Sequence, residues 1–190
     1  MEKANILSIL RSKKTVFSYK DILLSVKEKN PLLLNRRLSY YIKNKELYSI
    51  RKGFYAKDKD YDKYELATKI YTPSYISFET VLSKVGCIFQ FYSQIFLASY
   101  LTREVKVDKQ IYLYKKLKES VLTNRAGIEQ KDNYSIACPE RAFLDIVYLN
   151  KNYYFDKLDV LNWQKVMKIL PIYNNKRMEK EINKYYKQYK

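Results

Sequence analysis

Apolar residues in the first 56 positions recur at helical spacing in three stretches and then alternate on either side of a turn. The apolar positions of the first two stretches are Ile6, Leu7, Ile9 and Leu10, and then Ile22, Leu23 and Val26. Ser18, followed three residues later by Asp21, forms a capping-box-like start for the second helix. Pro31 disfavours helical geometry at Asn30 and suits the first turn of a new helix. The pattern therefore predicts three short helices, the third beginning near Leu32.

The third predicted helix has two chemically different sides. At 100° per residue, one sector contains Leu34, Leu38, Tyr41 and Ile42. The opposite sector contains Arg36, Ser39, Tyr40 and Lys43, with Asn35 and Arg37 flanking it. An apolar side that packs on a core and a basic, hydrogen-bonding side that enters a groove are typical of the recognition helix of a DNA-binding protein. An ordinary surface helix with a solvated polar face would show the same pattern.

The segment that follows favours the first of these two interpretations. Residues 47–50 and 54–56 alternate around a turn at Gly53, which predicts a hairpin with Arg51 and Lys52 at its tip. A basic hairpin next to a basic helix indicates a winged helix-turn-helix that binds double-stranded DNA. The candidate DNA-binding residues are Ser18, Tyr19, Lys20, Asn35, Arg36, Arg37, Ser39, Tyr40, Lys43, Arg51 and Lys52.

The rest of the chain predicts a second domain that mixes helices and strands. We expect a helix over residues 64–71, a break at 72–74, and a helix from Ser77 and Glu79 to about Val85 that ends at Gly86. Short segments with period-two character follow at 93–101, 111–115, 127–130 and 134–137. A helix is expected from Pro139, and its apolar side consists of Ala142, Phe143, Ile146 and Leu149. Further helices are expected over 162–170 and from Lys176 onward, the last with an apolar stripe of Met178, Ile182, Tyr185 and Tyr189. The predicted fold class is α+β, with a winged helix-turn-helix over 1–60 and, over 61–190, a mixed domain that has a small, mostly antiparallel sheet and C-terminal helices.

The net charge of the chain favours a polyanionic partner. Its 37 basic and 20 acidic residues give a formal charge of +17, and a field of that sign attracts nucleic acid, an anionic membrane surface or an acidic protein. The surplus lies at the two ends: residues 1–56 carry 13 basic and 4 acidic side chains, and residues 165–190 carry 8 and 2. A general bias toward Lys explains part of this surplus but not its placement.

Several chemistries are excluded by residue types that the chain lacks. It has no His, which excludes Cys/His zinc sites and His-dependent nucleophilic catalysis, and we expect no bound metal and no cofactor. Glu140 and Asp145 are the one carboxylate pair considered for catalysis, but a helix N-terminus and an amphipathic helix account for them, so we expect no enzyme. Cys87 and Cys138 are expected to be buried free thiols, although one disulfide is possible. We expect a cytoplasmic protein, because no apolar segment suits a signal peptide or a membrane span.

Three motifs occur in a specific order along the chain. They are RKGFY at residues 51–55, PSYISFETVLS at 73–83 and PERAFLD at 139–145, and Asn162-Trp163 and Tyr173-Asn174-Asn175 follow them. In this order they resemble the AbiEi family of antitoxins over nearly the whole chain. The resemblance implies a type IV toxin-antitoxin system, in which a DNA-binding head represses its own operon through inverted repeats. It also implies a C-terminal domain that counteracts a nucleotidyltransferase-type toxin, with which the antitoxin need not form a stable complex. The protein is expected to be a monomer or a weak dimer.

Other interpretations of the sequence remain open. The chain could be a stand-alone winged-helix regulator without a toxin, or an RNA-binding or protein-interaction module. Its 21 Tyr residues, interleaved with Lys, could stack on single-stranded bases, although most of them fall on predicted core positions. The basic C-terminal segment could contact DNA phosphates, which is the interpretation we favour, or an acidic partner.

Overall fold

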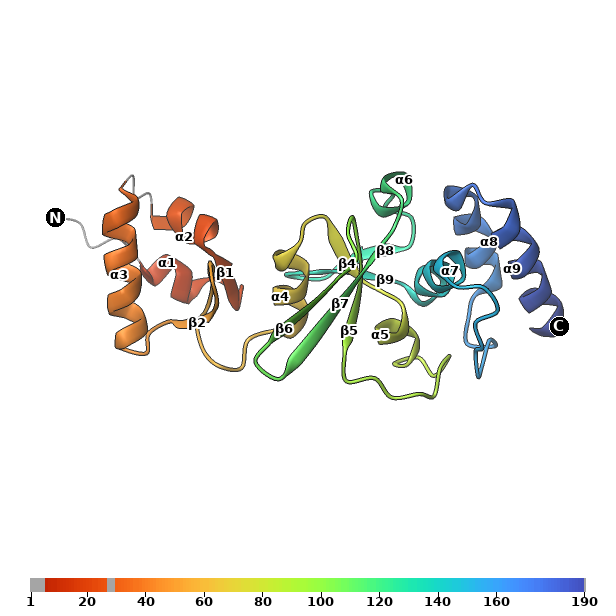
Figure 1. The fold of residues 1–190 in the computed structure, drawn as a ribbon, viewed down its shortest axis with the longest axis horizontal. Helices are drawn as coiled ribbons and strands as arrows, with labels where there is room; N and C mark the ends of the chain where they lie inside the picture. Colours follow the sequence, from red (N-terminus) through yellow and green to blue (C-terminus); the bar gives the residue numbers. More distant parts are fainter. Residues whose placement is uncertain (1–5, 27–29, 190) are drawn as a thin grey trace. The chain divides into compact units, whose positions relative to one another are not determined.

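The computed structural model describes residues 6–26 and 30–189, which belong to two compact units, Met1–Lys69 and Ile70–Lys190. Each unit contains helices and a sheet of its own, so the chain has the expected α+β class (Figure 1). The first unit includes the helix after residue 62, whereas the sequence indicated a division at about residue 60. Within the described ranges, no helix is long and apolar enough to cross a membrane.

The first unit places three helices before a hairpin, with one additional strand between the first two helices. In chain order its elements are α1 (Ile6–Arg11), β1 (Val16–Ser18), α2 (Tyr19–Val26), α3 (Pro31–Lys43), β2 (Tyr48–Arg51), β3 (Phe54–Ala56) and α4 (Lys63–Ile70). Strand β3 lies in the middle of an antiparallel three-stranded sheet with the order β1-β3-β2. The sequence analysis did not predict β1, which adds an edge strand to the predicted hairpin.

The core of the first unit joins its three N-terminal helices to the start of the hairpin. The buried residues of this core are Ile9, Phe17, Ile22, Leu34, Leu38 and Leu47, and Tyr19, Leu23, Tyr41, Ile42 and Tyr55 pack against them. Ile9 and Ile22 therefore lie on the apolar faces predicted for the first two helices, while Leu10 is 37% exposed. The side chains of Ile6, Leu7 and Val26 lie outside what the structure describes.

Helix α2 starts where the sequence predicted, through a reciprocal pair of capping contacts. The Ser18 amide and hydroxyl donate to one Asp21 carboxylate oxygen at 2.9 and 2.8 Å, and the Asp21 amide donates back to the Ser18 hydroxyl at 3.1 Å. Burial raises the pKa of Asp21, but the two bonds from Ser18 and the charge of Lys69 outweigh burial and lower it overall. The ionised carboxylate is therefore the form that stabilises the start of the helix.

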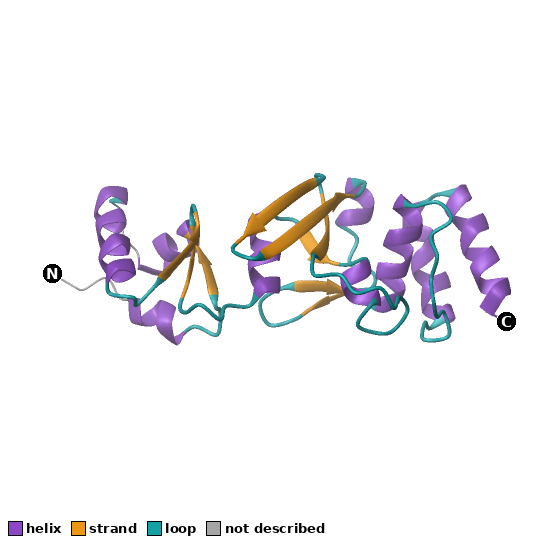
Figure 2. Ribbon diagram, turned by 60° about the horizontal axis from the view of Figure 1, so that its bottom comes forward, coloured by secondary structure: helices purple, strands orange, loops and turns teal. Residues whose placement is uncertain are grey.

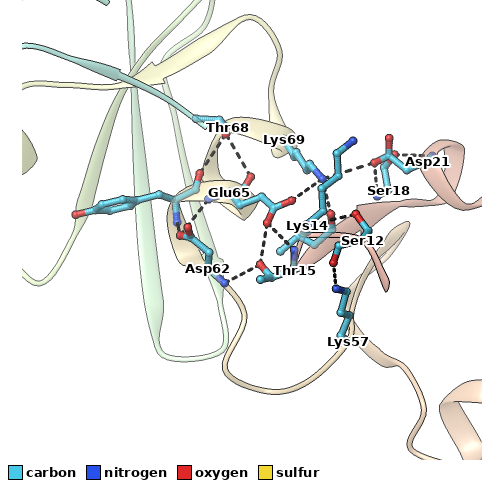
Figure 3. A network of polar contacts seen from close by, with 12 residues as sticks. Ser12, Lys14, Thr15, Ser18, Asp21, Lys57, Asp62, Glu65, Thr68 and Lys69 are labelled. Atoms are coloured by element: carbon cyan, nitrogen blue, oxygen red, sulfur yellow. Dashed lines mark hydrogen bonds and ion pairs between the residues drawn. The ribbon is translucent and has the colours of Figure 1, made fainter. Parts of the chain in front are cut away.

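Helix α4 joins the first unit through the buried carboxylate of Glu65 (Figure 3). The Thr15 amide and hydroxyl both donate to Glu65 Oε2 at 2.8 Å, and Lys69 Nζ donates to Oε1 at 2.9 Å. Lys69 also donates to the Val16 carbonyl, and Asp62 caps α4 by accepting the Tyr64 amide at 2.7 Å. A buried charge needs such partners, so these contacts tie α4 to the segment that leads into β1.

The second unit contains a six-stranded sheet and a group of helices at one end of it (Figure 2). Its strands are β4 (Ser74–Ile76), β5 (Ile95–Ser99), β6 (Arg103–Val107), β7 (Gln110–Lys116), β8 (Ile128–Gln130) and β9 (Ser135–Ala137), in the order β6-β7-β5-β4-β9-β8. Its helices are α5 (Glu79–Leu82), α6 (Glu119–Leu122), α7 (Pro139–Leu149), α8 (Trp163–Ile169), the 3-10 helix η1 (Leu170–Tyr173) and α9 (Lys176–Tyr189). Three strand pairs are antiparallel, while β5–β7 and β4–β9 are parallel.

Helix α7 is the centre of the second unit, because α5, α8, α9 and β9 all pack against it. Its residues from Glu140 to Val147 are buried, including the predicted apolar positions Ala142, Phe143 and Ile146. Leu149, the last predicted apolar position, is 39% exposed. In α9 the predicted stripe is present at Met178 and Ile182, both fully buried, and at half-buried Tyr185, while the side chain of Tyr189 lies outside what the structure describes.

Asp145 was expected on the polar side of an amphipathic helix, and this expectation is wrong. The residue is fully buried, and its carboxylate accepts hydrogen bonds from Arg141 Nε at 3.2 Å, Tyr173 Oη at 2.6 Å, Ser77 Oγ at 2.7 Å and Tyr75 Oη at 3.0 Å. Burial and the nearby Asp145 charge raise the pKa of Tyr75 and of Tyr173, which keeps both hydroxyls protonated as donors. These four donors replace the hydrogen bonds to water that the Asp145 carboxylate loses on burial. An ionised carboxylate can therefore lie in this core.

Arg141, the partner of Asp145, donates its other hydrogen bonds to three backbone carbonyls and, from Nη2, to the Tyr75 hydroxyl at 2.8 Å. It is fully buried, and its two terminal nitrogens donate to the carbonyls of Val121 at 2.7 Å, Ala126 at 2.8 Å and Asn124 at 3.2 Å. The guanidinium therefore fixes the chain from α6 toward β8 against α7. Glu140, the other carboxylate considered for catalysis, accepts the Asn162 amide and pairs with Lys165, both at 3.2 Å.

Ser77 does not cap α5 as expected, because its hydroxyl is bonded to Asp145. The residue before α5 is instead Phe78, which is buried and has a φ of 57°. The helix proper ends at Leu82, and the chain reaches Gly86, with a φ of 73°, through turns. A helix was expected to continue to about Val85, but the regular helix is only one turn long, from Glu79 to Leu82.

Gly127 occupies a position where any side chain would clash with neighbouring residues. Its φ is +74°, and a Cβ there would lie 2.8 Å from Ile169 Cδ1, 2.9 Å from Arg141 Cβ and 3.1 Å from Cys138 Sγ. We expect Gly127→Ala to lower the free energy of unfolding by well over the roughly 1 kcal/mol that a positive φ alone costs. Gly86→Ala is the matched control, since Gly86 has a φ of +73° with nothing within 4 Å. Urea unfolding of the two variants measures the difference, and equal losses would contradict the packing argument.

The capping carboxylate of Asp21 predicts a dependence of stability on pH. The pKa of Asp21 is lowered in the folded state. Its contribution to the free energy of unfolding is therefore complete above the pKa in the unfolded chain, about 3.9, and is lost as the pH falls through the pKa in the folded protein. Asp21→Asn should lower the free energy of unfolding by about 1 kcal/mol at pH 7 and by progressively less below about pH 4. Urea titrations at several pH values, with exposed Asp60→Asn as the control, measure this change. A loss that is independent of pH would show that the carboxylate charge is unimportant.

Candidate nucleic-acid interface

Helix α3 begins at the residues that the sequence indicated. The Asn30 side chain accepts the amides of Leu32 at 3.0 Å and Leu33 at 3.4 Å, and Pro31 occupies the first helical position. A side-chain cap satisfies amides that lack a partner in the first turn, and proline has no amide to satisfy there. The start of α3 is thus fixed by local chemistry.

One side of α3 is buried in the core of the first unit, as predicted. Leu34 is 2% exposed and Leu38 is 4% exposed, while Tyr41 and Ile42 pack around them. This anchoring determines which side of the helix faces outward. Figure 1 shows α3 beside α1 and α2 as the longest helix of the unit.

The outward side of α3 is basic and rich in hydrogen-bonding groups. Its exposed residues include Asn35, Arg36, Ser39, Tyr40 and Lys43, and Tyr40 is 61% exposed. Leu32, one turn before Arg36, is an exposed apolar residue at the start of the same side. The helix contains no acidic residue. The structure therefore brings together five of the residues predicted to contact DNA, while Arg37 is half-buried at the border of this face.

Two of these side chains already have a preferred arrangement. The Ser39 hydroxyl donates to the Asn35 carbonyl one turn earlier, at 2.9 Å. The Tyr40 ring packs edge-on against the Tyr41 ring, with centroids 5.7 Å apart. Arg36 and Lys43 supply the positive charge of the face, and an arginine can donate two parallel bonds to a guanine edge or a phosphate.

The hairpin presents fewer basic groups than the sequence predicted. Its turn consists of Lys52, which is exposed, and Gly53, which has a φ of +81°. Arg51 was expected at the tip, but it is the last residue of β2 and is half-buried. Its Nη1 atom is buried and has no hydrogen-bond partner among the described residues. The register between β2 and β3 is irregular between Ser49 and Arg51.

The start of α2 contributes one exposed cation near this turn. The Tyr19 amide donates to the Gly53 carbonyl at 2.8 Å, which places Lys20 and Lys52 on neighbouring segments. Ser18 and Tyr19 have structural roles, since Ser18 caps the helix and Tyr19 packs against the core. Burial also raises the pKa of Tyr55 in β3, so its hydroxyl is neutral near neutral pH.

The described residues contain little that suits metal binding or thiol chemistry. They include no group of three or more His, Cys, Asp or Glu residues that could hold a metal ion. Both cysteines are buried and unpaired, as expected. Burial raises the pKa of Cys87 to about 12 and also raises that of Cys138, so neither is a thiolate at neutral pH.

Comparison of the chain with models of known protein families gives no match, and comparison with curated proteins finds no significantly similar sequence.

Proposed function

We propose that the first unit is a winged helix-turn-helix that binds double-stranded DNA, with α3 as its recognition helix. The observation that carries this proposal is the outward face of α3, which presents Arg36, Tyr40 and Lys43 without any acidic residue opposite a buried apolar face. The order of helix, strand, two helices and hairpin supports the same proposal, since it supplies a scaffold, a recognition helix and a wing. Lys20 and Lys52 would contact phosphates beside the groove.

We further propose that the protein is an autorepressor and the antitoxin of a type IV toxin-antitoxin system. This part is supported by the resemblance of residues 51–55, 73–83 and 139–145 to the AbiEi family. The second unit would then counteract a nucleotidyltransferase-type toxin without catalysis, without a cofactor and without requiring a stable complex with the toxin. The DNA site would be a pair of inverted repeats upstream of its own operon, bound by a monomer at each half-site or by a weak dimer.

The recognition-helix assignment predicts different effects at the helix and at the wing. Arg36→Ala and Tyr40→Ala should weaken binding to the upstream DNA and reduce the preference over a scrambled duplex, with about 1–3 kcal/mol lost at Arg36. Lys52→Ala should weaken binding to both duplexes equally. It should also lower the slope of log affinity against log salt concentration by about one. Gel-shift titrations at two salt concentrations separate these effects.

Lys63→Ala is the matched control for this series, because Lys63 is an exposed lysine on α4 of the same unit. It removes one positive charge without touching α3 or the wing. If Arg36→Ala, Tyr40→Ala and Lys63→Ala all keep the affinity and sequence preference of the unaltered chain, α3 is not the recognition helix.

The antitoxin proposal predicts rescue of growth. Co-expression of the chain with a nucleotidyltransferase-type toxin encoded in the same operon should restore growth that the toxin alone arrests. The double variant Arg36→Ala/Tyr40→Ala, expressed from an unrelated promoter, should rescue equally well, because neutralisation is assigned to the second unit. Failure of the unaltered chain to rescue would leave a stand-alone regulator as the remaining function of this architecture.

A further inference from the structure

A basic hollow lies between the chain that follows α7 and the first turns of α9, in the second unit. It has a volume of about 490 Å³. Its charged lining residues are Lys151, Lys176, Arg177, Lys180, Glu181 and Lys184. Asn152 completes the lining. Five cations and one carboxylate therefore share a single surface depression.

The one carboxylate of the hollow is occupied by structural contacts. Glu181 accepts the Asn152 amide at 2.7 Å and Arg177 Nη1 at 3.2 Å. Arg177 Nη2 donates to the carbonyls of Val147 at 3.2 Å and Tyr148 at 2.8 Å, near the end of α7. These bonds fix the loop and α9 on α7, so the hollow is built by the fold and its shape does not depend on the lysines.

The lysines of the hollow form a row without neutralising partners. Lys176, Lys180 and Lys184 are exposed and recur every four residues, which places them on one side of α9 about 6 Å apart along its axis. Lys151 faces the same depression from the loop. None of the four lysines forms an ion pair within the part of the chain that the structure describes.

This arrangement is unfavourable for the isolated protein. Like charges four residues apart on a helix repel each other. Lys176 occupies the first position of α9, where the helix dipole disfavours a cation. A bound polyanion would relieve both effects, and the row is long enough for several charges rather than one.

The chemistry of the lining favours phosphates over a protein surface. No apolar or aromatic side chain lines the hollow, so it lacks the buried anchors on which a protein partner depends. Lysine ammonium groups are mobile point charges that bind phosphates without requiring a fixed geometry. The spacing of the row is comparable to that of successive phosphates along one nucleic-acid strand.

We propose that the row Lys176, Lys180 and Lys184, with Lys151 opposite, is a second nucleic-acid contact that binds the phosphate backbone independently of base sequence. The contact belongs to the second unit, and the inference does not require that α3 reads DNA. It gives the basic C-terminal segment a positioning role, because backbone contacts add affinity and leave the choice of sequence to another surface.

The test compares two triple variants of the full chain that remove the same charge. Lys176→Gln/Lys180→Gln/Lys184→Gln removes the row, and Lys106→Gln/Lys109→Gln/Lys118→Gln removes three exposed lysines elsewhere in the unit. Affinity for a duplex of scrambled sequence is measured by fluorescence anisotropy over a series of salt concentrations. Circular dichroism verifies that both variants are folded.

Loss of the row should reduce the affinity for the duplex by about tenfold or more. It should lower the slope of log affinity against log salt concentration by about two to three, since each phosphate contact contributes about 0.9 to that slope. The control variant should change the slope by less than one. Equal changes in the two variants would overturn the proposal. Competition by poly-glutamate as effective as that by a duplex of equal charge would also overturn it, in favour of an acidic protein partner.

The same measurements in the Arg36→Ala/Tyr40→Ala background separate this inference from the proposed function. If the α3 changes leave binding unaltered while loss of the row weakens it, the row on α9 is a backbone contact and α3 is not the recognition helix. If the α3 changes remove sequence preference while loss of the row has no effect on affinity or slope, the reverse holds.

Discussion

A buried carboxylate satisfied by several donors is the interaction on which each unit depends. Asp145 in α7 binds Arg141 and three hydroxyls from separate elements, so one charge joins β4, α7 and η1. Glu65 has the same role on a smaller scale, since it joins α4 to the segment before β1. Removing a partner from such a site leaves an uncompensated charge, at a cost of about 3–5 kcal/mol.

The two basic surfaces of the chain differ in what their chemistry can discriminate. The outward face of α3 combines a guanidinium, an amide and hydroxyls, which are groups that distinguish base edges. The row on α9 consists of ammonium groups alone, which respond to charge density. A protein with both surfaces can recognise a sequence with one unit and gain affinity from the other, and salt concentration would alter the second contribution most.

The sequence predicted elements whose signal is local, and it failed where distant residues decide. Asn30 and Pro31 begin α3, and Ser18 and Asp21 begin α2, because capping needs only neighbours along the chain. Strands β1 and β4 were not predicted, and length is not the reason, because β3, β8 and β9 also have three residues each and were predicted. Asp145 was placed on a polar face because its partners, Tyr75, Ser77 and Tyr173, are far away in sequence. Arg51 was expected at the tip of the hairpin, whereas β2 extends through it and its side chain is half-buried. The recurrence of Lys176, Lys180 and Lys184 every four residues can be read in the sequence. The sequence does not show that Lys151 and Asn152 lie opposite them and close a hollow.

The position of Glu65 also determines where the first unit ends as a folding entity. A polypeptide that stops after β3, at about residue 60, would contain all of the helices and strands named for DNA binding. It would nevertheless lack Glu65 and Lys69, and the Thr15 amide and hydroxyl and the Val16 carbonyl would lose their partners. Cleavage in the charged segment 57–61 would therefore not release an intact head. The smallest portable piece that keeps the first unit intact therefore includes α4, although α4 carries none of the residues proposed to contact DNA.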